Sequence, residues 1–466
     1  MCPSRIKAPD GIAAIGRRTL VVLFLLVFVV HSVSPSAQVT DSRLSVLTAY
    51  DLLHHASLDL GDLPDRATTE FSAADYDVVR VSGRDLPFFP YAPMALLVPV
   101  VGLAEAVGID PLELQVNDPN ETWKLEIPAA ALVVAATTVV MALVALTMAV
   151  GSVAERRRTA LLTALFFAFG TAAWSTASRS FWQHTPAMLF VALAVLQLVR
   201  GRRAPRSYAL LGAFVALGFT MRPSVAALAA VLGMWLLVSD RRRFVTFALG
   251  SAAVLVPFAG INLVAYGGLL PPYFQPDRLG PEASLSFFDA LATHGVSPSR
   301  GVLVYTPLLL LIPLSLRLAR RAGADMTVFH LAIAVAGMHW VVVASYGSTG
   351  GSSYGSRFFT EITPILVLLL VPLVNGLVAA TLTRGLRVAA LALTTVSVVL
   401  AGTGATLRAG FCWSATPEFI EDDPHRVWDL NDPQLLRPVR DLVDGESVRS
   451  IVIGACRPAS ATRPRD

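Results

Sequence analysis

The most regular pattern along the chain is a series of long apolar runs separated by short polar segments, many of them rich in arginine. A membrane-spanning helix needs about 20 mostly apolar residues, and eleven runs approach or reach that length. They cover residues 19–36, 128–150, 159–177, 184–199, 207–221, 223–239, 244–264, 301–316, 326–345, 358–377 and 388–407. The pattern therefore predicts an all-α polytopic membrane protein with about eleven transmembrane helices.

A further apolar segment, 91–108, carries Pro93, Pro99 and Glu105. Cytoplasmic loops are enriched in lysine and arginine, and basic clusters occur at 17–18, 156–158, 200–206, 241–243, 317–321 and 384–387. If all of these clusters are cytoplasmic, an even number of crossings separates each neighbouring pair. Three apolar runs, 19–36, 91–108 and 128–150, lie between the clusters at 17–18 and 156–158, so two of them cross and one does not. The proline-containing run 91–108 is the one that we expect to stay outside, as a surface or re-entrant helix. The N-terminus is then inside and the C-terminus outside.

Composition and charge agree with a membrane protein. Only 15% of the residues are charged and 54% are apolar or aromatic, whereas a soluble domain has roughly 25% charged residues. This excludes an ordinary soluble enzyme and a disordered chain. The net charge of +4 separates by side into 19 basic and four acidic residues inside, and 18 basic and 29 acidic residues outside. An acidic outer face offers no basic patch, so we expect no nucleic-acid partner.

Two parts follow from this topology. Residues 1–407 form a transmembrane domain with a long first outer loop, 37–127, in which residues 41–55 read as a helix. Residues 408–466 form an extracytoplasmic tail. Its two cysteines, Cys412 and Cys456, either form a disulfide or remain separate thiols. We expect its acidic run, 421–423, to be a solvated face, with weak metal binding as the alternative.

The candidate chemistry lies at the outer ends of the predicted helices. The span interiors hold almost no ionisable side chains, which counts against a coupled transporter. Instead, Arg222, Arg300 and Arg357 lie at outer helix ends, and Asp41 closely follows the first span. Arginine forks match phosphate oxygens, and a carboxylate can accept the proton of an attacking hydroxyl. The set predicts transfer from a lipid-phosphate donor.

Seven motifs in order along the chain resemble one family. Through these motifs the sequence resembles the GT-C superfamily of polyprenyl-phosphate-sugar-dependent membrane glycosyltransferases. Within that superfamily it is most similar to uncharacterised bacterial members related to protein mannosyltransferases and aminoarabinose transferases. The motifs are DSRLSVLTAYDLL at 41–53, SGRDLPFFPYAP at 82–93, FWQHTP at 181–186, TMRPS at 220–224, SPSRG at 297–301, YGSRF at 354–358 and HRVWDLNDPQ at 425–434.

This resemblance implies inverting transfer of a hexose or pentose from a polyprenyl-phosphate-linked donor to a glycan, lipid or protein acceptor. It implies a bacterial cytoplasmic (inner) membrane, with the active site facing outside. Asp41 is the expected catalytic base. The donor phosphate is expected at Arg300, Arg357 and Arg222, and the substrate pocket at Trp182, Gln183, His184, Arg84 and Tyr354.

The sequence does not decide whether the protein depends on a metal. Many members of the family have two adjacent or nearly adjacent acids in the first loop, whereas Asp41 stands alone until Asp51. We therefore assign no residues to a metal site and name no cofactor with certainty. Use of a divalent cation is the open alternative.

Two other functions are compatible with the sequence. One is a flippase or transporter of lipid-linked sugars, which would need polar groups near the membrane midplane. The other is a non-catalytic membrane scaffold whose tail binds an envelope partner. Placement of Asp41 near Arg300 or Arg357, across a single outer cavity, would favour the enzyme.

Overall fold

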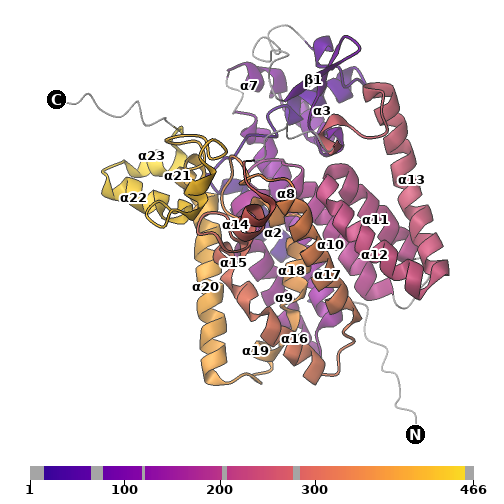
Figure 1. The fold of residues 1–466 in the computed structure, drawn as a ribbon, viewed down its shortest axis with the longest axis vertical. Coiled ribbons are helices and arrows are strands. Elements are labelled where there is room, and N and C mark those ends of the chain that lie inside the picture. The colour runs from indigo at the N-terminus through magenta and orange to yellow at the C-terminus, as the bar shows by residue number, and fades with distance from the viewer. Residues whose placement is uncertain (1–14, 64–76, 118–120, 202–206, 276–283, 457–466) are drawn as a thin grey trace.

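The structure is a computed structural model that describes residues 15–63, 77–117, 121–201, 207–275 and 284–456. It is mostly helical (Figure 1). Helices coincide with all eleven predicted runs, as α2 (Arg17–Val33), α8 (Trp123–Met148), α9 (Val153–Phe169), α10 (His184–Gly201), α11 (Ser207–Met221), α12 (Ala226–Ser239), α13 (Arg241–Tyr266), α15 (Val302–Tyr305) with η5 (Pro307–Leu311) and α16 (Ile312–Arg321), α17 (Thr327–Ala344), α18 (Thr363–Leu368) with α19 (Val371–Val378), and α20 (Arg384–Thr406).

Four helices in the described ranges have the length and apolar character needed to cross a bilayer, namely α8, α13, α17 and α20. The full count of eleven crossings and the N-in, C-out topology stay predictions. Two of the predicted spans are interrupted helices, because proline lacks an N–H and disfavours helix in the preceding residue. Pro307 and Pro313 lie at the breaks between α15 and α16, and Pro372 lies at the start of α19.

The segment 91–108 forms two short helices, α5 (Tyr91–Ala95) and α6 (Val98–Ala106). At 1.5 Å per residue, the longer of them covers only about 14 Å, less than half of a hydrocarbon core of about 30 Å. Val101 of α6 packs in one apolar cluster with Val46 of the first loop and Leu125 of α8. The shortness of both helices and this packing agree with a segment that lies on the bundle rather than crossing the membrane.

The first outer loop contains more than helices. It forms α3 (Ser45–His54), η1 (Leu60–Asp62) and α7 (Pro111–Asn117), but also an antiparallel hairpin of β1 (Val78–Val81) and β2 (Arg84–Pro87). The all-α prediction is therefore wrong at this point. Ser82 and Gly83 both have positive φ, and two such residues suit the tight turns that join right-twisted strands.

The tail is a compact unit built from short helices. These are α21 (Arg408–Cys412), η7 (Pro424–Trp428), η8 (Gln434–Leu436), α22 (Arg437–Val443) and α23 (Val448–Ile453). A disulfide joins Cys412 to Cys456, which resolves the alternative that the sequence left open. Trp413 forms a small core with Ile420 and Val427. In Figure 1 the tail helices lie at the same end of the bundle as α3, β1 and α7.

Two glycines allow α11 and α13 to pack with their backbones in contact. A Cβ atom on Gly212 of α11 would lie 2.0 Å from the carbonyl oxygen of Phe247, and one on Gly250 of α13 would lie 2.0 Å from that of Ala209. Ser251 also donates a hydrogen bond of 3.1 Å to the Gly212 carbonyl. Small residues at membrane helix interfaces permit this approach.

Gly212→Ala should therefore lower the thermal unfolding temperature of the purified protein. The added methyl group overlaps the Phe247 carbonyl, and overpacking of this kind typically costs roughly 1–3 kcal/mol. Gly260→Ala is the matched control on α13, because a Cβ there meets nothing within 4 Å, and alanine favours helix over glycine. If G212A unfolds at the wild-type temperature, the close contact is not the basis of this packing.

Candidate active site

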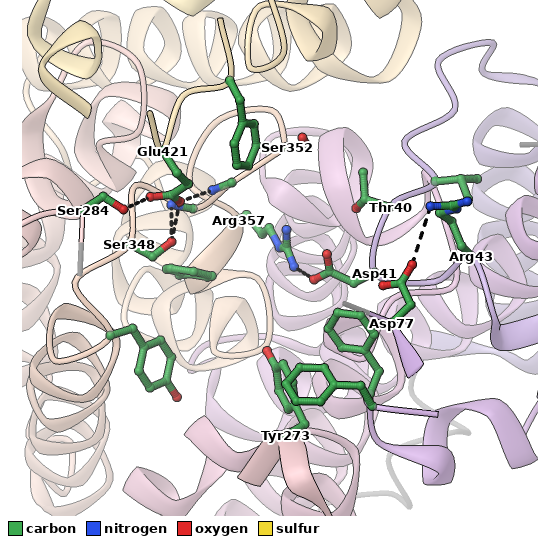
Figure 2. Close-up of a pocket in the computed structure, with 18 of the residues that line it drawn as sticks. Thr40, Asp41, Arg43, Asp77, Tyr273, Ser284, Ser348, Ser352, Arg357 and Glu421 are labelled. Carbon is green, nitrogen blue, oxygen red and sulfur yellow. Dashed lines mark hydrogen bonds and ion pairs between the residues drawn. The ribbon is translucent and has the colours of Figure 1, made fainter. Parts of the chain in front are cut away.

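A cavity of about 570 Å³ lies where the first outer loop, the tail and the glycine-rich loop after α17 (residues 347–355) meet. Figure 2 shows Asp41 and Arg357 near its centre. It is lined by Val39, Thr40, Asp41, Arg43, Asp77, Phe88, Phe89, Tyr273, Ser284, Tyr346, Gly347, Ser348, Gly350, Gly351, Ser352, Arg357, Phe358, Phe419 and Glu421. Of the residues predicted from the sequence, Asp41 and Arg357 belong to this lining.

Asp41 and Arg357 form an ion pair across the cavity, although 316 residues separate them in the chain. Asp41 lies in the turn that precedes α3, and Arg357 begins the short helix η6 (Arg357–Phe359). The guanidinium carbon of Arg357 lies 4.2 Å from the centre of the Trp182 ring. This cation–π contact supports the guanidinium from one face. The pair thus brings a carboxylate and a supported guanidinium to one surface.

Arg357 keeps donor capacity for a further anion. An arginine side chain has five N–H donors. The Arg357 Nε donates to His184 Nε2 at 3.2 Å, and Nη2 contacts Asp41. The described part of the chain supplies no hydrogen-bond acceptor to Nη1, which lies beside Gly351 on the cavity wall. A phosphate oxygen in the cavity could therefore accept from this side chain.

The prediction that Arg300 binds phosphate is contradicted by its contacts. Arg300 is 1% exposed and does not line the cavity. All five of its N–H donors are used, because they bind the carbonyl oxygens of Thr349, Gly351 and Ser353 and the side chains of Gln434 and Ser414. The role of Arg300 is to hold the glycine-rich loop in place.

Arg222 is likewise committed to a protein partner. Its Nε donates to the Glu361 carboxylate at 2.8 Å, and Nη1 donates to the Tyr273 hydroxyl at 3.4 Å. The side chain is 1% exposed and does not line the cavity. Its predicted direct contact with the donor phosphate is therefore not supported. In both arginines the deciding factor is a buried acceptor that lies far away in the sequence.

Two residues predicted for the substrate pocket lie elsewhere. Arg84, at the start of β2, donates to the carbonyls of Val264 and Ala265 at 3.0 and 2.8 Å. The last carbonyls of a helix lack hydrogen-bond donors within the helix. Arg84 therefore supplies hydrogen bonds to two such carbonyls at the C-terminal end of α13. Tyr354 is fully buried and donates to the Leu400 carbonyl at 3.1 Å. Neither residue contacts the cavity.

The FWQHTP motif lies behind Arg357 rather than in the cavity lining. Trp182 supports the guanidinium, as described above. His184 is fully buried between Glu361 and Arg357. Gln183 is 5% exposed, and its amide has no hydrogen-bond partner in the described ranges. Trp182 and His184 of this motif therefore contact Arg357 from behind. They were predicted to contact the substrate directly, but neither they nor Gln183 lines the cavity.

Several lining residues were missed by the sequence reading. Arg43 and Asp77 form an ion pair of 3.7 Å beside Asp41. Phe89 and Tyr273 have ring centres 5.2 Å apart and give the cavity an aromatic wall. Arg43 could have been predicted, because it follows Asp41 by two residues in the motif at 41–53. Asp77 had no comparable signal.

The acidic run 421–423 was expected to be a solvated face, and Asp422 and Asp423 are indeed exposed, but Glu421 is not. Its carboxylate lines the cavity and accepts hydrogen bonds from Ser284, Ser348, Thr349 and Gly351. Burial raises the pKa of this carboxyl, but these hydrogen bonds outweigh it, so the pKa of Glu421 lies below its ordinary range. Its acceptor positions are filled, which makes it a structural link between tail and loop rather than a free base.

The Glu421 link should make stability depend on pH. Because its pKa is lowered in the folded state, this stabilisation is present above the ordinary glutamate value of about 4.3 and is lost as the pH falls through the folded-state value. Glu421→Gln should lower the unfolding temperature at pH 7, and the gap to wild type should shrink towards pH 3. The neighbouring exposed acid gives the control, Asp422→Asn, which should unfold like wild type. An equal effect of both variants would contradict this role.

A metal centre has no obvious ligand set here. In the segments that the structure describes, no group of three or more His, Cys, Asp and Glu residues could hold a metal ion.

Comparisons with known proteins find a likeness among solved structures. No protein-family model and no curated protein matches the sequence. Among solved structures, the chain is similar to ArnT from Cupriavidus metallidurans bound to undecaprenyl phosphate, with a TM-score of 0.47 and 16% sequence identity. The alignment covers 86% of this chain and 69% of that chain. A likeness at this level assigns no function to the chain.

Proposed function

We propose that this protein is a membrane glycosyltransferase that moves a sugar from a polyprenyl-phosphate donor to a hydroxyl of an extracytoplasmic acceptor, with inversion. The observation that carries the proposal is the Asp41–Arg357 pair in a cavity at the end of the helical bundle. The two residues supply the groups that this transfer needs, a proton acceptor and a cation for the leaving phosphate. A convergent pair of this kind favours an enzyme over a flippase or a scaffold.

In the proposed reaction, the acceptor oxygen attacks the anomeric carbon of the donor sugar and forms the new glycosidic bond. The bond between that carbon and the phosphate oxygen breaks, and the electron pair leaves with the polyprenyl phosphate. Asp41 takes the proton of the attacking hydroxyl. Arg357 neutralises the charge that develops on the phosphate. Attack from the side opposite the leaving group inverts the anomeric configuration.

The remaining cavity walls fit an amphiphilic donor. Phe88, Phe89 and Tyr273 offer aromatic surface next to Asp41, and such rings can pack on a prenyl unit or on the apolar face of a sugar. The proposed placement is the outer face of a bacterial cytoplasmic membrane, with the lipid tail of the donor in the bilayer.

The proposal is tested with the full-length protein in lipid nanodiscs. Polyprenyl-phosphate-linked hexoses and pentoses are supplied with sugar or lipid acceptors, and released polyprenyl phosphate is measured together with the anomeric configuration of the product. We expect at least one donor to be consumed with inversion. Failure to consume any donor, together with failure to bind undecaprenyl phosphate, would overturn the proposal.

A further inference from the structure

We propose that His184 and Glu361 are positioning residues that orient Arg357 towards the cavity. This inference rests on the proposed function, because it concerns how the phosphate-binding guanidinium is held. Neither residue lines the cavity, so both act through Arg357 rather than on the substrate.

Glu361 is fixed from several directions in the protein interior. Its carboxylate accepts from Arg222 Nε at 2.8 Å, from His184 Nδ1 at 2.6 Å and from the hydroxyl of Ser224. All of these side chains are buried. Breaking such a buried pair by removing one partner is costly, since it leaves an uncompensated charge. The position of Glu361 is therefore tightly defined.

This carboxylate in turn defines the role of each nitrogen of His184. Because Nδ1 faces Glu361, it carries the hydrogen and donates. In a neutral imidazole the other nitrogen is then an acceptor, and Nε2 accepts from the Nε–H of Arg357 at 3.2 Å. A contact at Nε fixes the plane of the guanidinium. With Trp182 packed on one face of that plane, Nη1 and Nη2 are left towards Gly351 and Asp41.

A second buried histidine, His339, is a control that distinguishes a positioning role of His184 from a role in core packing. His339 is also fully buried, and its Nε2 lies 3.9 Å from the Glu361 carboxylate. However, it bonds the Phe358 carbonyl at 2.7 Å and makes no hydrogen bond to Arg357 in the described residues. If the imidazoles matter only as core side chains, the two histidines should be equally sensitive to substitution.

The test measures binding of undecaprenyl phosphate to the full-length protein in nanodiscs. His184→Phe keeps a ring but removes both polar contacts, and should raise the Kd tenfold or more. His184→Gln keeps a donor and an acceptor and should stay within about threefold of wild type. His339→Phe should bind like wild type. If H184F does not fold, His184→Asn is compared with H184Q, because asparagine is too short to bridge Glu361 and Arg357.

A double-mutant cycle shows whether His184 acts through Arg357, since residues in one network give non-additive effects. In the background of Arg357→Ala, H184F should change the Kd less than twofold. Equal losses in H184F and H339F, or multiplying losses in the double variant, would overturn the positioning role. A wild-type protein that neither consumes a donor nor binds undecaprenyl phosphate would instead refute the proposed function, and this inference with it.

Discussion

Asp41→Asn should abolish most of the sugar transfer, with a fall in the rate of about 10²–10⁴-fold, the range that general acid–base catalysis contributes. Asparagine keeps the size of the side chain but cannot take the proton from the acceptor hydroxyl. The expected result is a low turnover rate with normal membrane expression and nearly normal binding of the donor. Release of polyprenyl phosphate from the lipid-linked sugar measures it.

Asp51→Asn provides the control for this variant. Asp51 is the next acid along the chain, but it bonds His55 at 2.8 Å and does not line the cavity. Burial raises the pKa of the Asp51 carboxyl, opposed by the hydrogen bond to His55, so the uncharged asparagine is tolerable there. D51N should transfer within about threefold of wild type. Full activity in D41N would place the base elsewhere.

Arg357→Lys should lower the transfer rate by about 10²–10³-fold, the loss seen when one donor to a developing oxyanion is removed. Lysine keeps the positive charge but lacks the planar fork of donors. A single ammonium cannot contact His184, Asp41 and a phosphate in the geometry that the guanidinium provides. The measurement is the rate with saturating donor, together with the Kd for undecaprenyl phosphate.

Arg84→Lys is the matched control, because the sequence also indicated Arg84 as a site residue and the structure places it against α13. R84K should keep at least a third of the wild-type rate. A large loss in R84K with no loss in R357K would show that the wrong arginine has been assigned to the phosphate.

Much of the fold follows from the sequence because membrane helices depend on length and apolar composition. All eleven predicted runs contain helices. The hairpin of β1 and β2 was missed because its strands are only four residues long, which is too short for an alternating pattern to be distinct. The disulfide was an open alternative, since no spacing rule decides whether Cys412 reaches Cys456.

The site was predictable only in part. Asp41 and Arg357 were found because a charge at an outer helix end is unusual in an apolar chain. The tasks of Arg222 and Arg300 could not be predicted, since they depend on acceptors 139 and up to 134 residues away. Glu421 looked like a surface acid because its hydrogen-bond donors come from other segments of the chain.

The most direct test of the central claim is an experimental structure of the full-length protein with undecaprenyl phosphate. We predict that the phosphate lies in the outer cavity, within hydrogen-bond distance of the Arg357 guanidinium and next to Asp41. A second cavity of about 640 Å³ includes Arg321 and Asn375 in its lining and lies near α16 and α19, away from the tail (Figure 1). A phosphate bound there, with the Asp41–Arg357 cavity empty, would contradict the account.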